Sequence, residues 1–245
     1  MTEKPVKPLF FCPHTSPVKK LLRIFFHLLY HQFAFTYDLV AATVSLGRWK
    51  GWVLSVLPFV RGNRILEIGH GPGHLQCALL DHGLLAFGID ESPQMGYLAK
   101  RNLTRFFRSK PKSTHDELLG YTQINLTRGI SQGLPFPAES FETLIATFPA
   151  EYIFDPKTLT EAQRVLTTQG RFIILPGATI LGRGILDRTM ALLFRITGQT
   201  PPDLSEILQE RSREPLGNAG FQVEVHELRI KSSLVFVLVA TKFST

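Results

Sequence analysis

A glycine-rich turn flanked by two acidic residues is the part of the sequence best suited to hold a ligand. Glu67 ends an apolar run typical of a buried strand, and Gly69, Gly71 and Gly73 alternate through the turn that follows. Glycine lets the backbone bend sharply and come close to a ligand. Asp90 stands at the end of the next apolar run, where an acid can accept hydrogen bonds from both ribose hydroxyls of a nucleoside. The pattern therefore predicts a nucleoside site.

The residues of the turn also indicate which kind of nucleoside it holds. A dinucleotide-binding fingerprint requires a glycine at the position of His74, and Pro72 stiffens the turn further. Glu67 would place a carboxylate beside a pyrophosphate, which is repulsive, whereas a carboxylate suits a ligand with an ammonium group. S-adenosylmethionine (SAM) has an ammonium group and a ribose but no phosphate. The turn therefore favours SAM over a nicotinamide dinucleotide.

An ordered set of motifs resembles the class I SAM-dependent methyltransferases. Glu67-x-Gly69-x-Gly71-x-Gly73 is similar to the first motif of that family. Two later stretches resemble the segments that lead into its fourth and fifth strands: Leu134-Pro135-Phe136 with Ser140-Phe141-Glu142-Thr143, and Arg164-Val165-Leu166 with Gly170-Arg171. The resemblance covers residues 62–176 by motif and 220–242 by pattern. Among subgroups it is nearest to the small-molecule enzymes of the ubiquinone/menaquinone-biosynthesis type.

The resemblance implies a set of cofactor-binding residues. Asp90 is similar to the ribose-binding acid of the family. Members of the subgroup often have an Asp four residues before the Leu-Pro-Phe, but Ile130 stands there, followed by Ser131. We therefore expect backbone groups near these two residues to contact the edge of adenine, and Met95 to pack on its ring. The expected set is Glu67, Gly69, His70, Gly71, Gly73, Asp90, Glu91, Met95, Ile130, Ser131 and Thr147, with the role of His70 left open.

No catalytic triad or pair of carboxylates is visible, which agrees with methyl transfer. This reaction is a displacement at a sulfonium carbon, so alignment of the acceptor and exclusion of water can supply much of the catalysis. A base is needed only if the acceptor must first lose a proton. Candidates for a base or an orienting group are His27, His31, Tyr37, Asp38, Glu151 and Tyr152. We select Tyr37, which resembles a lid residue of the family, and Glu151 and Tyr152, which follow the expected fourth strand.

The elements that must position these residues follow an alternating pattern. Buried-strand runs alternate with helical stretches from residue 64 onward, which predicts a parallel sheet covered by helices on both faces. Ser92 is a suitable N-cap for the helix that begins at Pro93. Two successive runs without a helix between them predict a closing antiparallel hairpin. The expected strands are Arg64–Ile68, Leu85–Asp90, Tyr121–Leu126, Thr143–Ala146, Arg171–Leu175, Gln222–Arg229 and Leu234–Lys242.

The expected helices complete a doubly wound, mostly parallel seven-stranded α/β fold of the Rossmann-like methyltransferase kind. One runs from the glycine turn to about His82, and another from Asp155-Pro156 to Leu166, with Gly170 as its terminator. We divide the chain into an amino-terminal arm with lid helices (residues 1–60) and a SAM-binding domain (61–245). The lid helices are expected near 19–46 and 48–59. A helical insertion at 177–217 carries two further expected helices, Ile185–Ile196 and Leu204–Arg211.

Charge and hydropathy indicate which partners are compatible with the chain. Its net charge of +7 is concentrated at the amino end and within residues 98–128. Residues 19–46 are strongly apolar but contain Arg23, His27, His31, Gln32 and Asp38, which argues against a membrane span and leaves a core or interfacial helix. We therefore expect a small, lipophilic acceptor, with peripheral membrane contact through 19–46 as one option.

Two alternatives to this function stay open. An RNA methyltransferase would suit the basic charge, but Thr147-Phe148-Pro149-Ala150 only loosely resembles an N-P-P-Y box, so we do not expect a nucleic-acid partner. A non-catalytic SAM-binding protein would suit the missing adenine-binding acid. The two cysteines, Cys12 and Cys77, lack zinc-ligand spacing and favour a reduced, cytoplasmic setting. We expect no metal site.

Overall fold

A seven-stranded sheet forms the centre of the molecule in the computed structural model, which describes residues 48–110, 124–149, 151–181 and 213–243. The strand order is β3-β2-β1-β4-β5-β7-β6. The strands are β1 (Arg64–Ile68), β2 (Leu85–Asp90), β3 (Asn125–Arg128), β4 (Phe141–Thr147), β5 (Leu166–Ile180), β6 (Phe221–Ile230) and β7 (Ser233–Lys242). β1 to β5 pair in parallel, whereas β7 is antiparallel to both β5 and β6. The predicted fold class is confirmed.

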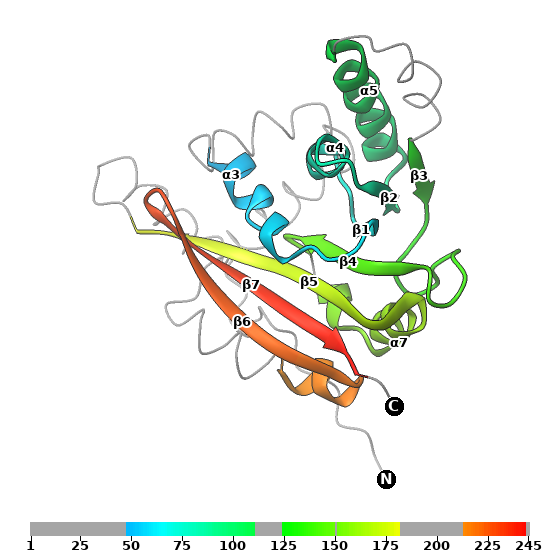
Figure 1. Cartoon of the computed structure of the whole chain (residues 1–245), viewed down its shortest axis with the longest axis vertical. Helices are drawn as coiled ribbons and strands as arrows, with labels where there is room; N and C mark the ends of the chain where they lie inside the picture. The colour runs from blue at the N-terminus through cyan, green and yellow to red at the C-terminus, as the bar shows by residue number, and fades with distance from the viewer. Residues whose placement is uncertain (1–47, 111–123, 150, 182–212, 244–245) are drawn as a thin grey trace, which may run out of the picture.

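Helices cover both faces of this sheet (Figure 1). One face carries α3 (Trp49–Leu54) and α4 (His74–Asp81), whose buried residues share a core with alternate residues of the strands. The other carries α7 (Pro156–Val165), which packs on the remaining strand residues. α5 (Pro93–Ser109) connects β2 to β3. Short 3-10 helices η2 (Leu57–Phe59) and η3 (Glu151–Phe154) follow α3 and β4, and residues 213–218 are helical before β6. The alternation of apolar residues between two cores follows from the two-residue repeat of a strand.

The predicted ends of several elements are confirmed. β1 and β2 have the expected bounds, and the Ser92 side chain accepts a hydrogen bond from the Met95 amide as the N-cap of α5. The Asp155 side chain caps α7 in the same way by accepting from the Lys157 amide. Helix starts were predictable because a capping side chain and a following proline are local signals.

Several predicted boundaries are wrong, and β5 (Leu166–Ile180) exceeds the expected Arg171–Leu175 at both ends. Gly170 does not terminate a helix, since α7 ends at Val165 and β5 begins at once with Leu166. Gly170 instead lies in an irregular part of β5, where a Cβ would come within 2.8 Å of the Thr167 carbonyl oxygen. β3 ends later than expected because Arg128 still pairs with Asp90 at the end of β2.

Part of the predicted lid lies outside the described residues. α3 and η2 occupy the place of the expected helix near 48–59. The expected helices at 19–46, Ile185–Ile196 and Leu204–Arg211 fall in ranges that the structure does not describe. β5 continues to Ile180, three residues into the expected insertion at 177–217. Among the described helices, none has the length and apolar character needed to cross a membrane.

Candidate functional site

The glycine turn after β1 has the backbone geometry that its sequence predicts. Gly69, Gly71 and Gly73 all have positive φ angles, of 72°, 50° and 81°, which side chains disfavour. The Gly69 amide donates to the Ile89 carbonyl oxygen over 2.8 Å and so ties the turn to β2. A Cβ on Gly73 would come within 3.0 Å of the Ala99 Cβ, whereas a Cβ on Gly71 would meet nothing within 4 Å. The turn is therefore packed at its helix end and open at Gly71.

Asp90 is held at the open side of this turn. One carboxylate oxygen accepts from the Gly71 amide over 2.9 Å, and the other accepts from the Ser92 amide over 2.9 Å. A carboxylate has about four acceptor positions, so it can still accept hydrogen bonds from two hydroxyl groups. The orientation of Asp90 is thus fixed before any ligand arrives, and its remaining capacity suits a ribose diol.

Glu67 lies below the turn at the end of β1 and is only 2% exposed. Its carboxylate accepts a hydrogen bond of 2.8 Å from Gln76 on α4. The pKa of Glu67 is raised to about 8, mainly because the carboxyl is buried; the Gln76 hydrogen bond lowers the pKa, and the nearby charge of Asp90 adds to the increase. Near neutral pH this carboxyl therefore holds its proton for most of the time, unless a positive charge is placed beside it.

His70 supports the turn from inside. Its ring is buried, and Nδ1 lies 2.7 Å from the Gly71 carbonyl oxygen. Burial lowers the pKa of His70, so the neutral ring donates its Nδ1 proton to that oxygen. A Cβ on Gly88 in β2 would come within 2.9 Å of the His70 ring, so the ring fits only against a glycine. Gly88 inside a strand was the overlooked sequence signal for this close approach.

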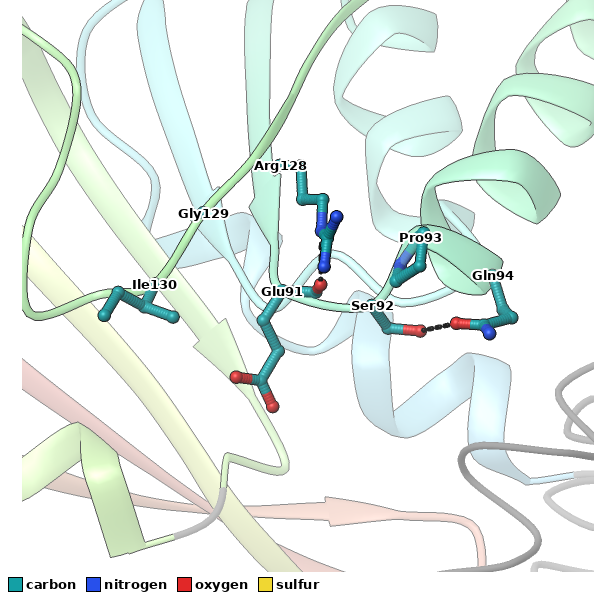
Figure 2. Close-up of a pocket in the computed structure, with 7 residues that line it drawn as sticks. All are labelled: Glu91, Ser92, Pro93, Gln94, Arg128, Gly129 and Ile130. Atoms are coloured by element: carbon teal, nitrogen blue, oxygen red, sulfur yellow. Dashed lines mark hydrogen bonds between the residues drawn. The ribbon is translucent and has the colours of Figure 1, made fainter.

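A hollow of about 460 Å³ opens beyond the carboxyl ends of β2 and β3. It is lined by Glu91, Ser92, Pro93, Gln94, Arg128, Gly129 and Ile130 (Figure 2). Arg128 directs its Nε at the Glu91 carbonyl oxygen over 3.1 Å and so joins the two loops that form the hollow. Glu91 and Ile130 belong to the predicted cofactor set, whereas the sequence analysis overlooked Arg128.

Three other predicted cofactor residues make contacts within the core or the sheet. The Ser131 hydroxyl lies 2.9 Å from the Thr158 hydroxyl of α7 and is buried there, so only its backbone is left to face a ligand. Met95 is 3% exposed and packs with Leu98. Thr147 is the last residue of β4 and pairs with β5. Their roles toward a cofactor stay predictions.

The predicted catalytic residues are only partly described. The Tyr152 hydroxyl from η3 lies 2.9 Å from where a Cβ on Gly69 would stand, which places the phenol at the glycine turn. Glu151 belongs to the same short helix, but its side chain is outside the described part of the structure. Tyr37 also lies outside the described residues, as do His27, His31 and Asp38. Within the described ranges, no group of His, Cys, Asp and Glu could hold a metal ion.

Comparison with known proteins agrees with this geometry. A family model described as a methyltransferase domain matches residues 66–174, from β1 into β5. Residues 66–174 are thus similar to this family of methyltransferase domains. A demethylmenaquinone methyltransferase of Symbiobacterium thermophilum is 29% identical over 166 residues, which cover 64% of this chain and 61% of the relative. The resemblance to SAM-dependent methyltransferases, with SAM as the cofactor of the family, is confirmed.

Two further similar proteins are named for ethanolamine compounds. A phosphatidylethanolamine N-methyltransferase of Cereibacter sphaeroides is 29% identical over 117 residues, covering 47% of this chain and 51% of the relative. The structure of Haemonchus contortus phosphoethanolamine N-methyltransferase 2 with SAM gives a TM-score of 0.56 at 15% identity, covering 89% of this chain and 60% of the other. That similarity shows a shared fold. This chain spans less than two thirds of the length of each of these three relatives.

Proposed function

We propose that this chain is an enzyme that transfers the methyl group of SAM to a small, lipophilic acceptor. The observation that carries the proposal is the open glycine turn between Glu67 and Asp90. Gly71 has space where a side chain would stand, and the Asp90 carboxylate is fixed beside it with acceptor capacity to spare. Both features suit the nucleoside and amino-acid parts of SAM.

Each part of the site has a separate task in this proposal. Asp90 accepts hydrogen bonds from the ribose hydroxyls, and the hollow beside Glu91 and Ile130 receives adenine. Glu67 ionises when the ammonium group of the ligand arrives, because the positive charge offsets its burial. The glycine turn lets backbone amides approach the ligand, since no side chain at Gly71 intervenes.

The reaction needs little more from the protein than alignment. When bound, SAM supplies a methyl group on a positively charged sulfur, which is a good leaving group. A nucleophilic atom of the acceptor takes the methyl group as the carbon–sulfur bond breaks. Tyr152 lies at the turn from the side of β4 and orients that acceptor. Glu151 and Tyr37 remain candidates for a base where the acceptor must lose a proton.

The lipophilic acceptor is proposed on two grounds. The sequence at the amino end is apolar and basic. Two relatives are named for a quinone and a phospholipid, although each is matched over only part of its length. We also propose a cytoplasmic protein that touches an anionic membrane through residues 19–46. Deleting residues 1–46 is expected to reduce sedimentation with anionic vesicles, and unchanged sedimentation would remove the membrane contact from the proposal.

The activity is tested with methyl-labelled SAM and three acceptor pools: demethylated quinones, phosphatidylethanolamine vesicles and total RNA. With the wild-type protein, we expect label to enter one of the two lipid pools. With the Gly71→Val variant, we expect no label in either pool. Label in RNA alone would replace the lipophilic acceptor with a nucleic acid. Tight binding of the demethylated product, S-adenosylhomocysteine, with no transfer to any pool would favour a non-catalytic SAM-binding protein.

A further inference from the structure

Phe148 has an unusual backbone conformation for its residue type. It follows directly after β4, at the edge of the sheet where the turn of β1 also lies. Its φ angle is 49°, in the left-handed region that bulky side chains rarely adopt. Its amide donates to the Leu175 carbonyl oxygen over 2.7 Å, which holds it there. Such conformations persist where the surroundings impose them, and they are concentrated at binding sites.

The ring of Phe148 lies flat on a tryptophan of α3. The centroids of Phe148 and Trp49 are 4.1 Å apart with the rings 25° from parallel. Trp52 is buried behind them, 6.2 Å from Phe148 and 6.4 Å from Trp49. Trp49 and Phe148 themselves are only half-buried. The pair therefore keeps part of its aromatic surface exposed, beside the end of β4.

Phe148 and Tyr152 border the end of β4 on different faces of the sheet. Phe148 packs against the core shared with α3 and α4. Tyr152 packs against the core shared with α7, with its hydroxyl at Gly69. The carboxyl end of β4 thus has an aromatic surface on one side and a phenol on the other. Filling the core does not by itself require a positive φ angle. We therefore look for a second role of the Phe148 side chain.

We propose that Phe148 and Trp49 form an aromatic wall of the acceptor site, which selects a flat aromatic ring over an acyl chain or an alkylamine. This inference rests on the proposed methyltransferase function and names the acceptor class of that site. A planar ring can stack on the exposed part of the pair, whereas a flexible chain gains no such contact. Phe148 acts as a specificity-determining residue and Trp49 as its support.

The chain has only two tryptophans, Trp49 and Trp52, and both contact Phe148. Tryptophan fluorescence, excited selectively over the five tyrosines, therefore reports on this wall. The probe is 2,3-dimethyl-1,4-naphthoquinone, a planar quencher whose blocked ring positions resist addition of thiols, titrated in the presence of S-adenosylhomocysteine. We expect saturable quenching that decan-1-ol does not reverse. Phe148→Leu is expected to weaken the probe by on the order of 5-fold, from the value of one aromatic pair.

Matched variants distinguish the loss of the Phe148 ring from a general effect of replacing a phenylalanine on probe binding. Leu keeps an apolar side chain on the same left-handed backbone, and Phe148→Tyr keeps the ring and is expected to bind the probe as the wild type does. Phe106→Leu, an equal change on α5 away from Trp49, is expected to have no effect. If Phe148→Leu does not fold, Trp49→Leu removes the other ring and leaves Trp52 as the reporter.

Three results decide the matter. Weaker binding in Phe148→Leu, with Phe148→Tyr and Phe106→Leu unchanged, supports the wall. Equal probe affinity in Phe148→Leu, or no saturable quenching while S-adenosylhomocysteine binds normally, overturns it. Failure of the wild type to bind S-adenosylhomocysteine by calorimetry is a different result, since it removes the proposed function on which the wall depends.

Discussion

The two sides of the proposed site, at the carboxyl ends of β2 and β4, differ in the groups that they present. On the side of β2, the glycine turn and Asp90 form the site mostly from backbone geometry and one fixed carboxylate. On the side of β4, Phe148 and Tyr152 contribute side chains that pack against α3 and against the core beside α7. The first arrangement suits an invariant cofactor, and the second suits a variable acceptor. Damage to one side should therefore leave binding at the other largely intact.

The largest expected effect comes from blocking the cofactor side. Gly71→Val places a branched side chain at a φ of 50° and in the open space where a ligand would approach. We expect the affinity for S-adenosylhomocysteine to fall on the order of 100-fold or more, measured by calorimetry. Gly83→Val is the matched control, because Gly83 has a φ of 72° and equally open surroundings but lies away from the turn. Equal losses in both variants would mean that backbone strain, and not the site, is responsible.

The next effect concerns the fixed carboxylate. Asp90→Ala removes the acceptor for the Gly71 amide as well as the proposed partner of the ribose. We expect binding of S-adenosylhomocysteine to weaken by about 1–3 kcal/mol, the cost of leaving hydroxyls unpaired. Asp155→Ala, which removes a carboxylate that caps α7, should change stability and not binding. An unaltered dissociation constant in Asp90→Ala would count against Asp90 as the ribose anchor.

A change on the acceptor side should slow methyl transfer and leave the affinity for the cofactor nearly unchanged. Tyr152→Phe removes the hydroxyl that lies at Gly69 and keeps the ring that packs with α7. We expect methyl transfer to slow by roughly 10-fold with little change in cofactor affinity, because orientation of the acceptor is lost. A loss of cofactor binding in this variant would show that the two sides are not separable.

Glu67 predicts a dependence on pH. Because its folded pKa is raised to about 8, the stability it contributes is fully present below the pKa of an unfolded glutamate and is lost as pH rises through about 8. Binding of an ammonium-bearing ligand near pH 7 should release a proton and strengthen as pH rises toward about 8. Calorimetry in buffers of different ionisation enthalpy measures this release. In Glu67→Gln, ligand binding should release no proton from this position. Proton release that persists in this variant would show that another group loses the proton.

The smallest expected effect tests stability alone. Ser92→Ala removes the side-chain oxygen that accepts from the Met95 amide at the start of α5. We expect a loss of about 1 kcal/mol in the free energy of unfolding, as for other N-cap replacements. Affinity for S-adenosylhomocysteine should hold, because Asp90 still accepts from the Ser92 backbone amide. A large loss of affinity would mean that the cap and the site are coupled.

The same comparison explains what the sequence could predict. The places of Gly71 in a tight turn and of Asp90 at a strand end were predictable, because turns, strand ends and helix caps are local patterns. Phe148 was not predicted as a site residue, because its φ angle and its contact with Trp49 depend on packing between distant segments. Arg128 was overlooked for a similar reason, since its contact with Glu91 joins the end of β3 to the segment after β2, which is distant in sequence. The end of α7 was predicted to within one residue, but Gly170 was wrongly assigned as its terminator, because that glycine lies in an irregular part of a strand.

The most direct measurement is a crystal structure of the chain with S-adenosylhomocysteine. We predict ribose hydroxyls within hydrogen-bonding distance of Asp90, the amino-acid end toward Glu67, and adenine in the hollow beside Glu91 and Ile130. An empty crevice at saturating ligand, or a nucleotide whose diphosphate lies on the glycine turn, would contradict the account.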